Sequence, residues 1–197
     1  MSRILIVDDE ESILKALKRV LTLTPCVSGG KLYKLSVDVF SSPLLALEKM
    51  QHTAYDLVLS DYRMPIMDGV QFLEALRQIQ PDAARMILSG YADLNGLIRA
   101  INDAGISRFI AKPWNDYELV SAIAQVLALR ELTLENQLLA DQARLATGLM
   151  SAHDIEIKRL EAEEPGITHV VWDVDGSVIF DESALHHHVA SKPDPAP

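Results

Sequence analysis

The chain has 197 residues, of which 49% are hydrophobic, and a formal net charge of −10 at pH 7. This length and composition suit one domain with a substantial core and an appendage, and the negative charge argues against binding to a phosphate backbone. The single cysteine, Cys26, excludes an internal disulfide, and no apolar run approaches membrane-spanning length. We therefore expect a cytoplasmic protein that binds neither nucleic acid nor a membrane.

Five short apolar runs have the composition of strands that are buried on both faces. They cover residues 3–7, 35–40, 56–60, 85–88 and 106–111. Helix patterns with the 3.6-residue period lie between them, at 13–21, 44–50, 70–76 and 94–101, and another begins at Asp116. Strict alternation of strand and helix predicts an α/β fold, a doubly wound five-stranded parallel sheet with helices on both faces.

Polar residues follow four of these strands at the point where each strand ends. They are Asp8, Asp9, Asp61, Ser89 and Lys112. Ligands of such sheets bind at the carboxyl ends of the strands. Three carboxylates placed together repel one another unless a cation offsets their charge, and oxygen ligands of this kind suit Mg²⁺. The pattern predicts a phosphate site, in which the lysine and the serine hydroxyl contact phosphoryl oxygens.

Each of these residues also has a simpler interpretation when it is considered alone. The acidic pair could stabilise the N-terminus of the first helix, and Ser89 could be an ordinary loop or capping serine. Lys112 could be a solvated lysine, and Phe109 a core residue. Only their joint placement favours the phosphate site.

Four segments in a fixed order carry a resemblance to a known family. They are VDDEES, SDYRMPIMDG, ILSG and FIAKPW. Residues 1–128 resemble the CheY-like receiver domain of two-component response regulators, which implies a flavodoxin-like fold. The resemblance implies that a histidine kinase or phosphotransfer protein phosphorylates Asp61.

The same resemblance implies a role for each matching residue. Asp8, Asp9, Asp61 and the backbone carbonyl of Arg63 would bind Mg²⁺. Lys112 and Ser89 would contact the phosphoryl group, Ser89 and Phe109 would form a switch, and the Lys112–Pro113 bond would be cis.

Residues 129–164 predict a helical, coiled-coil-like extension that continues the fifth helix, since residues 116–164 contain no proline. An apolar heptad row is formed by Leu127, Leu134, Leu138, Leu145, Ala152 and Ile155. Glu131, Asp141 and Gly148 interrupt it. Such a row needs a partner, and we expect a parallel or antiparallel homodimer through residues 116–164; the alternative is a helix that folds back on its own chain.

The charge of this extension argues against DNA binding. Residues 130–164 contain four basic and eight acidic residues, a net charge of −4, so a phosphate backbone would be repelled. No helix-turn-helix pattern with a basic recognition helix is present.

Three further segments carry weaker predictions. Residues 22–34 are longer than a tight connection and predict a surface loop or a hairpin-like extension. Residues 165–182 predict a β-hairpin around Asp175-Gly176, and residues 183–197 a disordered tail. The DVDGS sequence at 173–177 also resembles the opening motif of haloacid-dehalogenase-type phosphatases, but too few residues follow it for that fold.

These observations predict a response regulator that is not an enzyme. We expect phosphorylation of Asp61 to control protein contacts or dimerisation rather than DNA binding. Two alternatives remain: a phosphate sink or shuttle without its own output, and, more remotely, phosphatase activity of the DVDGS segment.

Overall fold

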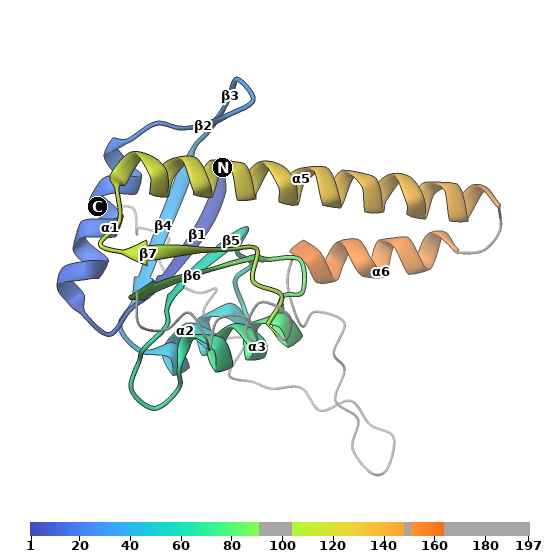
Figure 1. The fold of residues 1–197 in the computed structure, drawn as a ribbon. Coiled ribbons are helices and arrows are strands. Elements are labelled where there is room, and N and C mark those ends of the chain that lie inside the picture. Colours follow the sequence, from blue (N-terminus) through green and yellow to red (C-terminus); the bar gives the residue numbers. More distant parts are fainter. Residues whose placement is uncertain (91–103, 148–150, 164–197) are drawn as a thin grey trace, which may run out of the picture.

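The computed structural model describes residues 1–90, 104–147 and 151–163. Its centre is a five-stranded parallel sheet with the strand order β4-β1-β5-β6-β7 (Figure 1). The strands are β1 (Ser2–Val7), β4 (Leu35–Phe40), β5 (Leu57–Asp61), β6 (Ala84–Gly90) and β7 (Arg108–Lys112). The predicted doubly wound sheet is therefore confirmed, with strand ends displaced by one or two residues.

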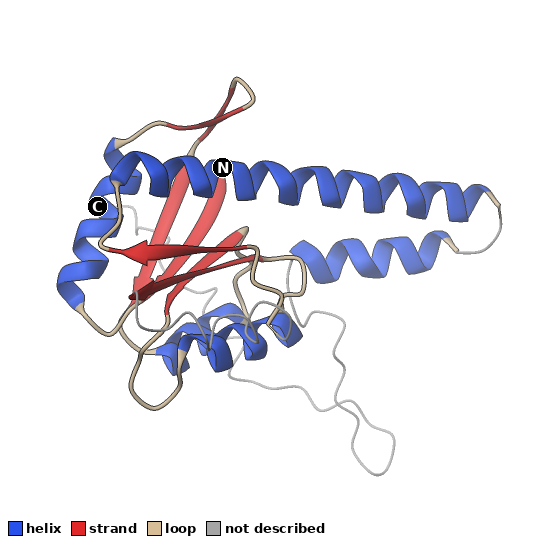
Figure 2. Ribbon diagram, viewed as in Figure 1, coloured by secondary structure: helices blue, strands red, loops and turns tan. Residues whose placement is uncertain are grey.

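Helices cover both faces of this sheet (Figure 2). They are α1 (Glu11–Leu23), α2 (Pro43–Met50), α3 (Gly69–Ile79) and α5 (Asp116–Ala146). Helices α1 and α5 pack against one face of β1 at Ile4 and Ile6, and α2 and α3 pack on the other face at Leu5 and Val7. The helix predicted at 94–101 lies outside the described residues.

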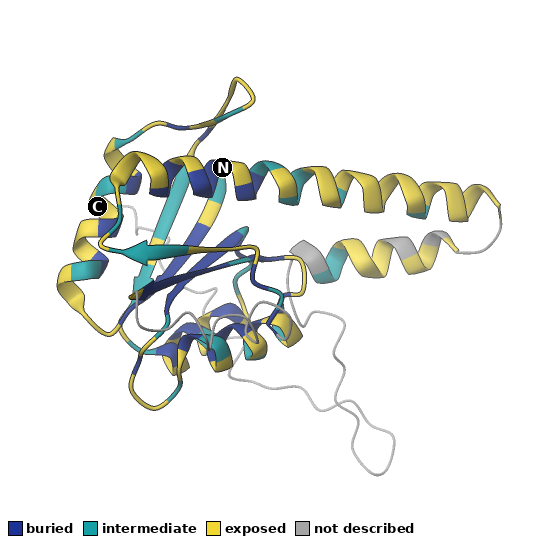
Figure 3. Ribbon diagram, viewed as in Figure 1, coloured by how far each residue is buried: buried dark blue, intermediate teal, exposed yellow. Residues whose placement is uncertain are grey.

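Burial on both faces explains why the strands are continuous apolar runs. Residues 4–7 of β1 and 57–59 of β5 are all 0% exposed (Figure 3). Strands with this pattern form the centre of parallel sheets whose two faces are covered by helices. The polar ends of the strands are consequently brought to one edge.

Residues 22–34 contain a β-hairpin, which confirms the second of the two predicted forms. Strands β2 (Cys26–Ser28) and β3 (Lys31–Tyr33) are antiparallel. Gly29 and Gly30 connect them with φ of 56° and 79°, a conformation that glycine adopts without steric cost. Cys26 and Tyr33 are buried, and the Cys26 Sγ lies 3.9 Å from the Val120 carbonyl oxygen of α5.

The predicted long helix is confirmed, because α5 continues beyond residue 128 into the extension. The prediction that this helix continues unbroken to residue 164 is wrong. Helix α5 ends at Ala146, and a second helix, α6 (Ala152–Glu163), runs back beside it (Figure 1). The Lys158 Nζ donates to an Asp141 carboxylate oxygen at 2.9 Å across the two helices. The chain thus folds back on itself, which was the alternative to a dimer, although folding back does not exclude self-association.

A capping box explains why a new helix begins there. The Ser151 Oγ accepts from the Asp154 backbone N at 3.2 Å, and the Asp154 carboxylate accepts from the Ser151 backbone N at 3.1 Å. These reciprocal bonds satisfy two donors that a helix start leaves unpaired. Gly148, three residues earlier, has a weak helix propensity.

Two adjacent residues of α5 attach this helix to loops before β5 and β6 and to the β2–β3 hairpin. The Arg130 Nη1 lies 2.7 Å from an Asp56 carboxylate oxygen, and its Nε donates to the Asp82 carbonyl at 2.8 Å. Glu131 accepts from Lys31 at 2.7 Å and from the Tyr33 hydroxyl at 3.0 Å. Because neighbouring residues of a helix point about 100° apart, the two residues hold α5 from two sides.

None of the described helices is long and apolar enough to cross a membrane. The hairpin predicted at 165–182 and the tail at 183–197 lie outside the described residues.

Candidate functional site

The strand register brings the predicted site residues to one edge of the sheet. Asp61 pairs with Leu88 at the end of β5, and Ser89 and Gly90 pair with Ala111 and Lys112 across β6 and β7. Asp8 directly follows β1, which lies next to β5. Asp8, Asp61, Ser89 and Lys112 are thereby gathered at the carboxyl ends of four adjacent strands.

The Lys112 ammonium group bridges two carboxylates at this edge. It donates to an Asp8 oxygen at 2.8 Å and forms an ion pair with Asp61. The Asp8 side chain is fully buried, and that of Asp61 is 9% exposed. Two acids therefore face one another with a single cation between them.

Burial and the contacts with Lys112 act in opposite directions on the pKa values of this cluster. Burial raises the pKa of Asp8, and the hydrogen bond from Lys112 only partly offsets that effect. For Lys112, burial alone would lower the pKa, but hydrogen bonds to Asp61 and Asp8 outweigh it, so its pKa is raised. The lysine thus remains a cation, which can hold the negative oxygens of a transferred phosphoryl group.

The loop after β5 fixes the position of the Asp61 carboxylate. The backbone N of Arg63 donates to the Asp61 Oδ2 at 2.7 Å, and the backbone N of Tyr62 donates to Leu88 O at 2.8 Å. Gly69, the first residue of α3, donates to Tyr62 O at 2.9 Å. One carboxylate oxygen is therefore held by the backbone, and the other faces Lys112.

Gly69 is a residue that sequence reasoning missed. A Cβ atom at this position would overlap with the Asp61 carbonyl oxygen, so the start of α3 can lie against the acceptor residue only because it is glycine. The side chain of Asp68 accepts from the Gln71 backbone N at 2.8 Å as the N-cap of α3. The D-G-x-Q order could have indicated this helix start.

The two predicted switch residues differ in burial. Ser89 is 3% exposed, and its hydroxyl donates to the Gly90 carbonyl at 3.2 Å. Phe109 is 43% exposed. The Lys112–Pro113 peptide bond, which lies between β7 and α5, is cis, as the resemblance to the receiver family implied.

The donor set fits a magnesium ion only in part. Among the described residues, no three acidic, histidine or cysteine side chains are grouped closely enough to hold a metal by themselves, and Asp9, unlike Asp8 and Asp61, is exposed. Mg²⁺ is commonly held by one or two carboxylates, with water and phosphate oxygens as the other ligands. Asp8 and Asp61 together with the Arg63 carbonyl are compatible with such a site.

The fold and this edge define a class: a doubly wound domain with a lysine-neutralised carboxylate pair at the carboxyl ends of its strands. The sequence matches the response regulator receiver domain over residues 4–124. The chain therefore belongs to the response regulator receiver family.

Curated relatives agree with this assignment. The chain is 30% identical over 183 residues to the hydrogenase transcriptional regulatory protein HoxA of Bradyrhizobium diazoefficiens, covering 93% of this chain and 34% of that protein. It is 32% identical over 128 residues to the response regulator protein TodT of Pseudomonas putida, covering 65% of this chain and 52% of that protein. The chain spans only about a third to a half of the length of these relatives.

Solved structures show the same fold. An uncharacterized protein from Neptuniibacter caesariensis is 39% identical, with a TM-score of 0.61, covering 68% of this chain and 93% of that chain. A CheY-like receiver domain protein from Methanospirillum hungatei is 28% identical, with a TM-score of 0.59, covering 68% and 98%. Receiver domains are signalling modules that work with histidine kinases or phosphotransfer proteins, and the family binds Mg²⁺ at its phosphorylation site.

Proposed function

We propose that this chain is a two-component response regulator that accepts a phosphoryl group on Asp61 from a histidine kinase or phosphotransfer protein. The observation that carries the proposal is the Lys112 ammonium group placed between the buried carboxylates of Asp8 and Asp61. This arrangement presents a carboxylate nucleophile beside a fixed positive charge. Nucleophile position and charge neutralisation are the main requirements of phosphoryl transfer.

In the proposed reaction, the Asp61 carboxylate oxygen that is not held by Arg63 N attacks phosphorus. The new O–P bond replaces the N–P bond of phosphohistidine, whose imidazole leaves. Lys112 and the Ser89 hydroxyl then contact the oxygens of the transferred phosphoryl group, which comes to lie where Lys112 already contacts Asp61. Bound Mg²⁺, held by Asp8 and Asp61 with Asp9 and the Arg63 carbonyl, would neutralise charge on those oxygens.

Phosphorylation would act on a two-state element formed by Ser89 and Phe109. A phosphoryl group on Asp61 would draw the Ser89 hydroxyl toward itself and vacate space for the Phe109 ring. The half-exposed position of Phe109, on the strand that pairs with β6, supports this role.

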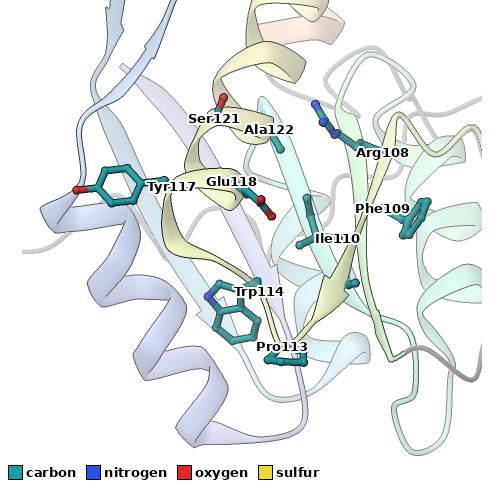
Figure 4. A pocket seen from close by; sticks show the side chains of 10 residues that line it. Arg108, Phe109, Ile110, Pro113, Trp114, Tyr117, Glu118, Ser121 and Ala122 are labelled. Atoms are coloured by element: carbon teal, nitrogen blue, oxygen red, sulfur yellow. The ribbon is translucent and has the colours of Figure 1, made fainter.

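The surface that would report the switch lies between β7 and the start of α5. A groove of about 660 Å³ is lined there by residues that include Ile110, Trp114, Tyr117 and Ser121 (Figure 4). In the same view Phe109 projects from β7 away from Trp114. Phe109 is nevertheless one of the residues that line the groove, so a change of its rotamer would alter the groove itself.

For the extension, residues 129–164, we propose contacts with proteins, rather than with DNA, as the output of the regulator. The four basic residues of the extension each form an ion pair with an acid. The pairs are Arg130–Asp56, Arg144–Asp141, Lys158–Asp141 and Arg159–Glu156. Cations that are already neutralised add little to phosphate binding. One of the relatives named above, HoxA, is a transcriptional regulatory protein, and this chain matches only 34% of its length.

A homodimer through the extension within residues 116–164 is the second part of the proposal. Folding back of α6 leaves large apolar side chains of α5 uncovered: Leu129, Leu132 and Leu139 are 55–61% exposed. Leu132 and Leu139 are seven residues apart and so lie on one side of the helix. A second copy of this chain could cover that row.

The site requires no enzymatic output, so we propose a cytoplasmic, non-enzymatic regulator. A phosphate sink or shuttle would use the same site without a state-dependent partner. Phosphatase activity of the DVDGS segment would depend on Asp175, which lies outside the described residues; hydrolysis of a model phosphate ester that survives Asp175→Asn excludes that candidate.

Two measurements test the proposed function. Incubation with acetyl phosphate and Mg²⁺ should add one phosphoryl group to the parent chain and none to Asp61→Asn, as read by mass spectrometry of the intact protein. Proteins captured from host lysate should then differ between the free chain and the chain treated with beryllofluoride. Identical captures dominated by a kinase would instead favour the phosphate sink.

A further inference from the structure

Ile66 has an unfavourable backbone conformation in the loop that follows the acceptor residue. Its φ is 74°, the only positive φ of a non-glycine residue in the described part of the chain. A β-branched side chain is strongly disfavoured in this region. Ile66 is also 86% exposed, so its side chain is almost entirely in water.

The turn around Ile66 is closed by a hydrogen bond. The Met67 backbone N donates to the Pro65 carbonyl at 2.8 Å, which closes a three-residue turn with Ile66 at its centre. Such a turn with a positive φ at its central residue is rare and strained. The proline ring fixes the backbone on one side, and the Gly69 to Tyr62 hydrogen bond of 2.9 Å closes the base of the loop.

Within the described part of the chain this side chain contributes little internal packing, because Ile66 is 86% exposed and belongs to neither hydrophobic core cluster. Both its conformation and its exposure therefore disfavour isoleucine here. Strained residues of this kind concentrate at functional sites, and this loop begins directly after Asp61. A contact with another protein would account for both the exposed apolar side chain and its position beside the acceptor residue.

We propose that Ile66 is a docking contact for the protein that donates the phosphoryl group, and that it packs against an apolar side chain beside the donor histidine. This inference rests on the proposed function. Transfer requires the reacting atoms to approach to about 3–3.5 Å, so a donor protein must lie on the loops at this edge of the sheet. A small phosphodonor has no such need.

The test compares protein and small-molecule donors on Ile66→Asn. Asparagine tolerates positive φ, so the variant removes both the strain and the apolar side chain. We expect its Tm to rise by about 2–4 °C and its labelling of Asp61 by acetyl phosphate to be unchanged. Transfer from an autophosphorylated histidine kinase, chosen from a panel as the fastest with the parent chain, should fall roughly tenfold.

Leu32→Asn is the matched control, because Leu32 is also an exposed apolar residue, 57% exposed, but lies on the β2–β3 hairpin. It should leave both reactions unchanged. Equal kinase transfer to parent and Ile66→Asn would overturn the docking role, and so would an equal fall with both donors. If the parent itself takes no phosphoryl group on Asp61 from acetyl phosphate, the proposed function fails, and the docking role fails with it.

Discussion

The Lys31 ammonium group lies 2.7 Å from both carboxylate oxygens of Glu131, joining two residues that are 100 positions apart in the sequence. This contact fastens the β2–β3 hairpin to α5. It has no counterpart in a receiver domain whose first helix and second strand are joined by a tight connection. The hairpin is thus a support for the extension, at the edge of the sheet away from Asp61.

Removal of this contact should expose the buried thiol of Cys26. Burial raises the pKa of Cys26 to about 11, so reaction with a disulfide reagent at pH 8 should be slow in the folded parent. Glu131→Ala should loosen the hairpin and speed the reaction by roughly two- to fivefold. Glu135→Ala, on the exposed surface of the same helix, is the control; equal rates in all three proteins would show that Glu131 does not hold the hairpin.

The hairpin attachment should also depend on pH. The hydrogen bond from Lys31 lowers the pKa of Glu131, so the attachment is complete above the ordinary glutamate pKa and is lost as pH falls through the lowered value. Conversely, the hydrogen bond to Glu131 raises the pKa of Lys31, so the attachment is complete below the ordinary lysine pKa and is lost as pH rises through the raised value.

This pH dependence can be followed by the Tyr33 amide resonance, which should be constant near neutral pH and shift in acid and in strong base. Because the Lys31 and Glu131 side chains are 58% and 44% exposed, we expect a local change without global unfolding. An amide shift that Glu131→Gln leaves unchanged would contradict the assignment.

Gly69→Ala should destabilise the protein although alanine is the better helix former. The added methyl group would overlap with the Asp61 carbonyl oxygen, so α3 or the acceptor loop must move, at a cost of about 1–3 kcal/mol. Urea denaturation measures the change, and acetyl phosphate labelling should slow in parallel. A stabilised, fully labelled variant would mean that the loop accommodates the methyl group.

Phe109→Ala should separate phosphorylation from its readout. The ring is 43% exposed, so its removal should cost little stability and leave labelling of Asp61 intact. A partner that the parent chain captures only in the beryllofluoride-treated state should no longer be captured by Phe109→Ala. If the variant and the parent capture that partner equally in both states, the ring is not the switch.

The dimer can be tested on its exposed leucine row. Light scattering at tens of micromolar should give twice the 21.8 kDa chain mass, and Leu139→Glu should restore the monomer because it buries a charge in an apolar contact. Leu45→Glu is the control, since Leu45 on α2 has nearly the same exposure, 57% against 56% for Leu139. A monomeric parent would reject the dimer.

The sheet and the placement of Asp8, Asp61, Ser89 and Lys112 could be predicted because local apolar runs and strand ends determine them. The turn-back of the extension depended on the capping box of Ser151 and Asp154, two polar residues that a search for apolar periodicity passes over. The close approach at Gly69 and the strained φ of Ile66 could not be predicted, because both depend on backbone positions that long-range pairing of strands determines.

The paired contacts of Arg130 and Glu131 also bear on how the protein can be joined to others. A helix held only at its N-terminus could change its angle to the sheet, and a protein bound to its far end would then have no fixed orientation relative to the receiver domain. Arg130 pairs with Asp56 on one side of α5, and Glu131 pairs with Lys31 on the other. These two ion pairs therefore fix the direction in which α5 leaves the receiver domain, and with it the orientation of a protein bound to the extension.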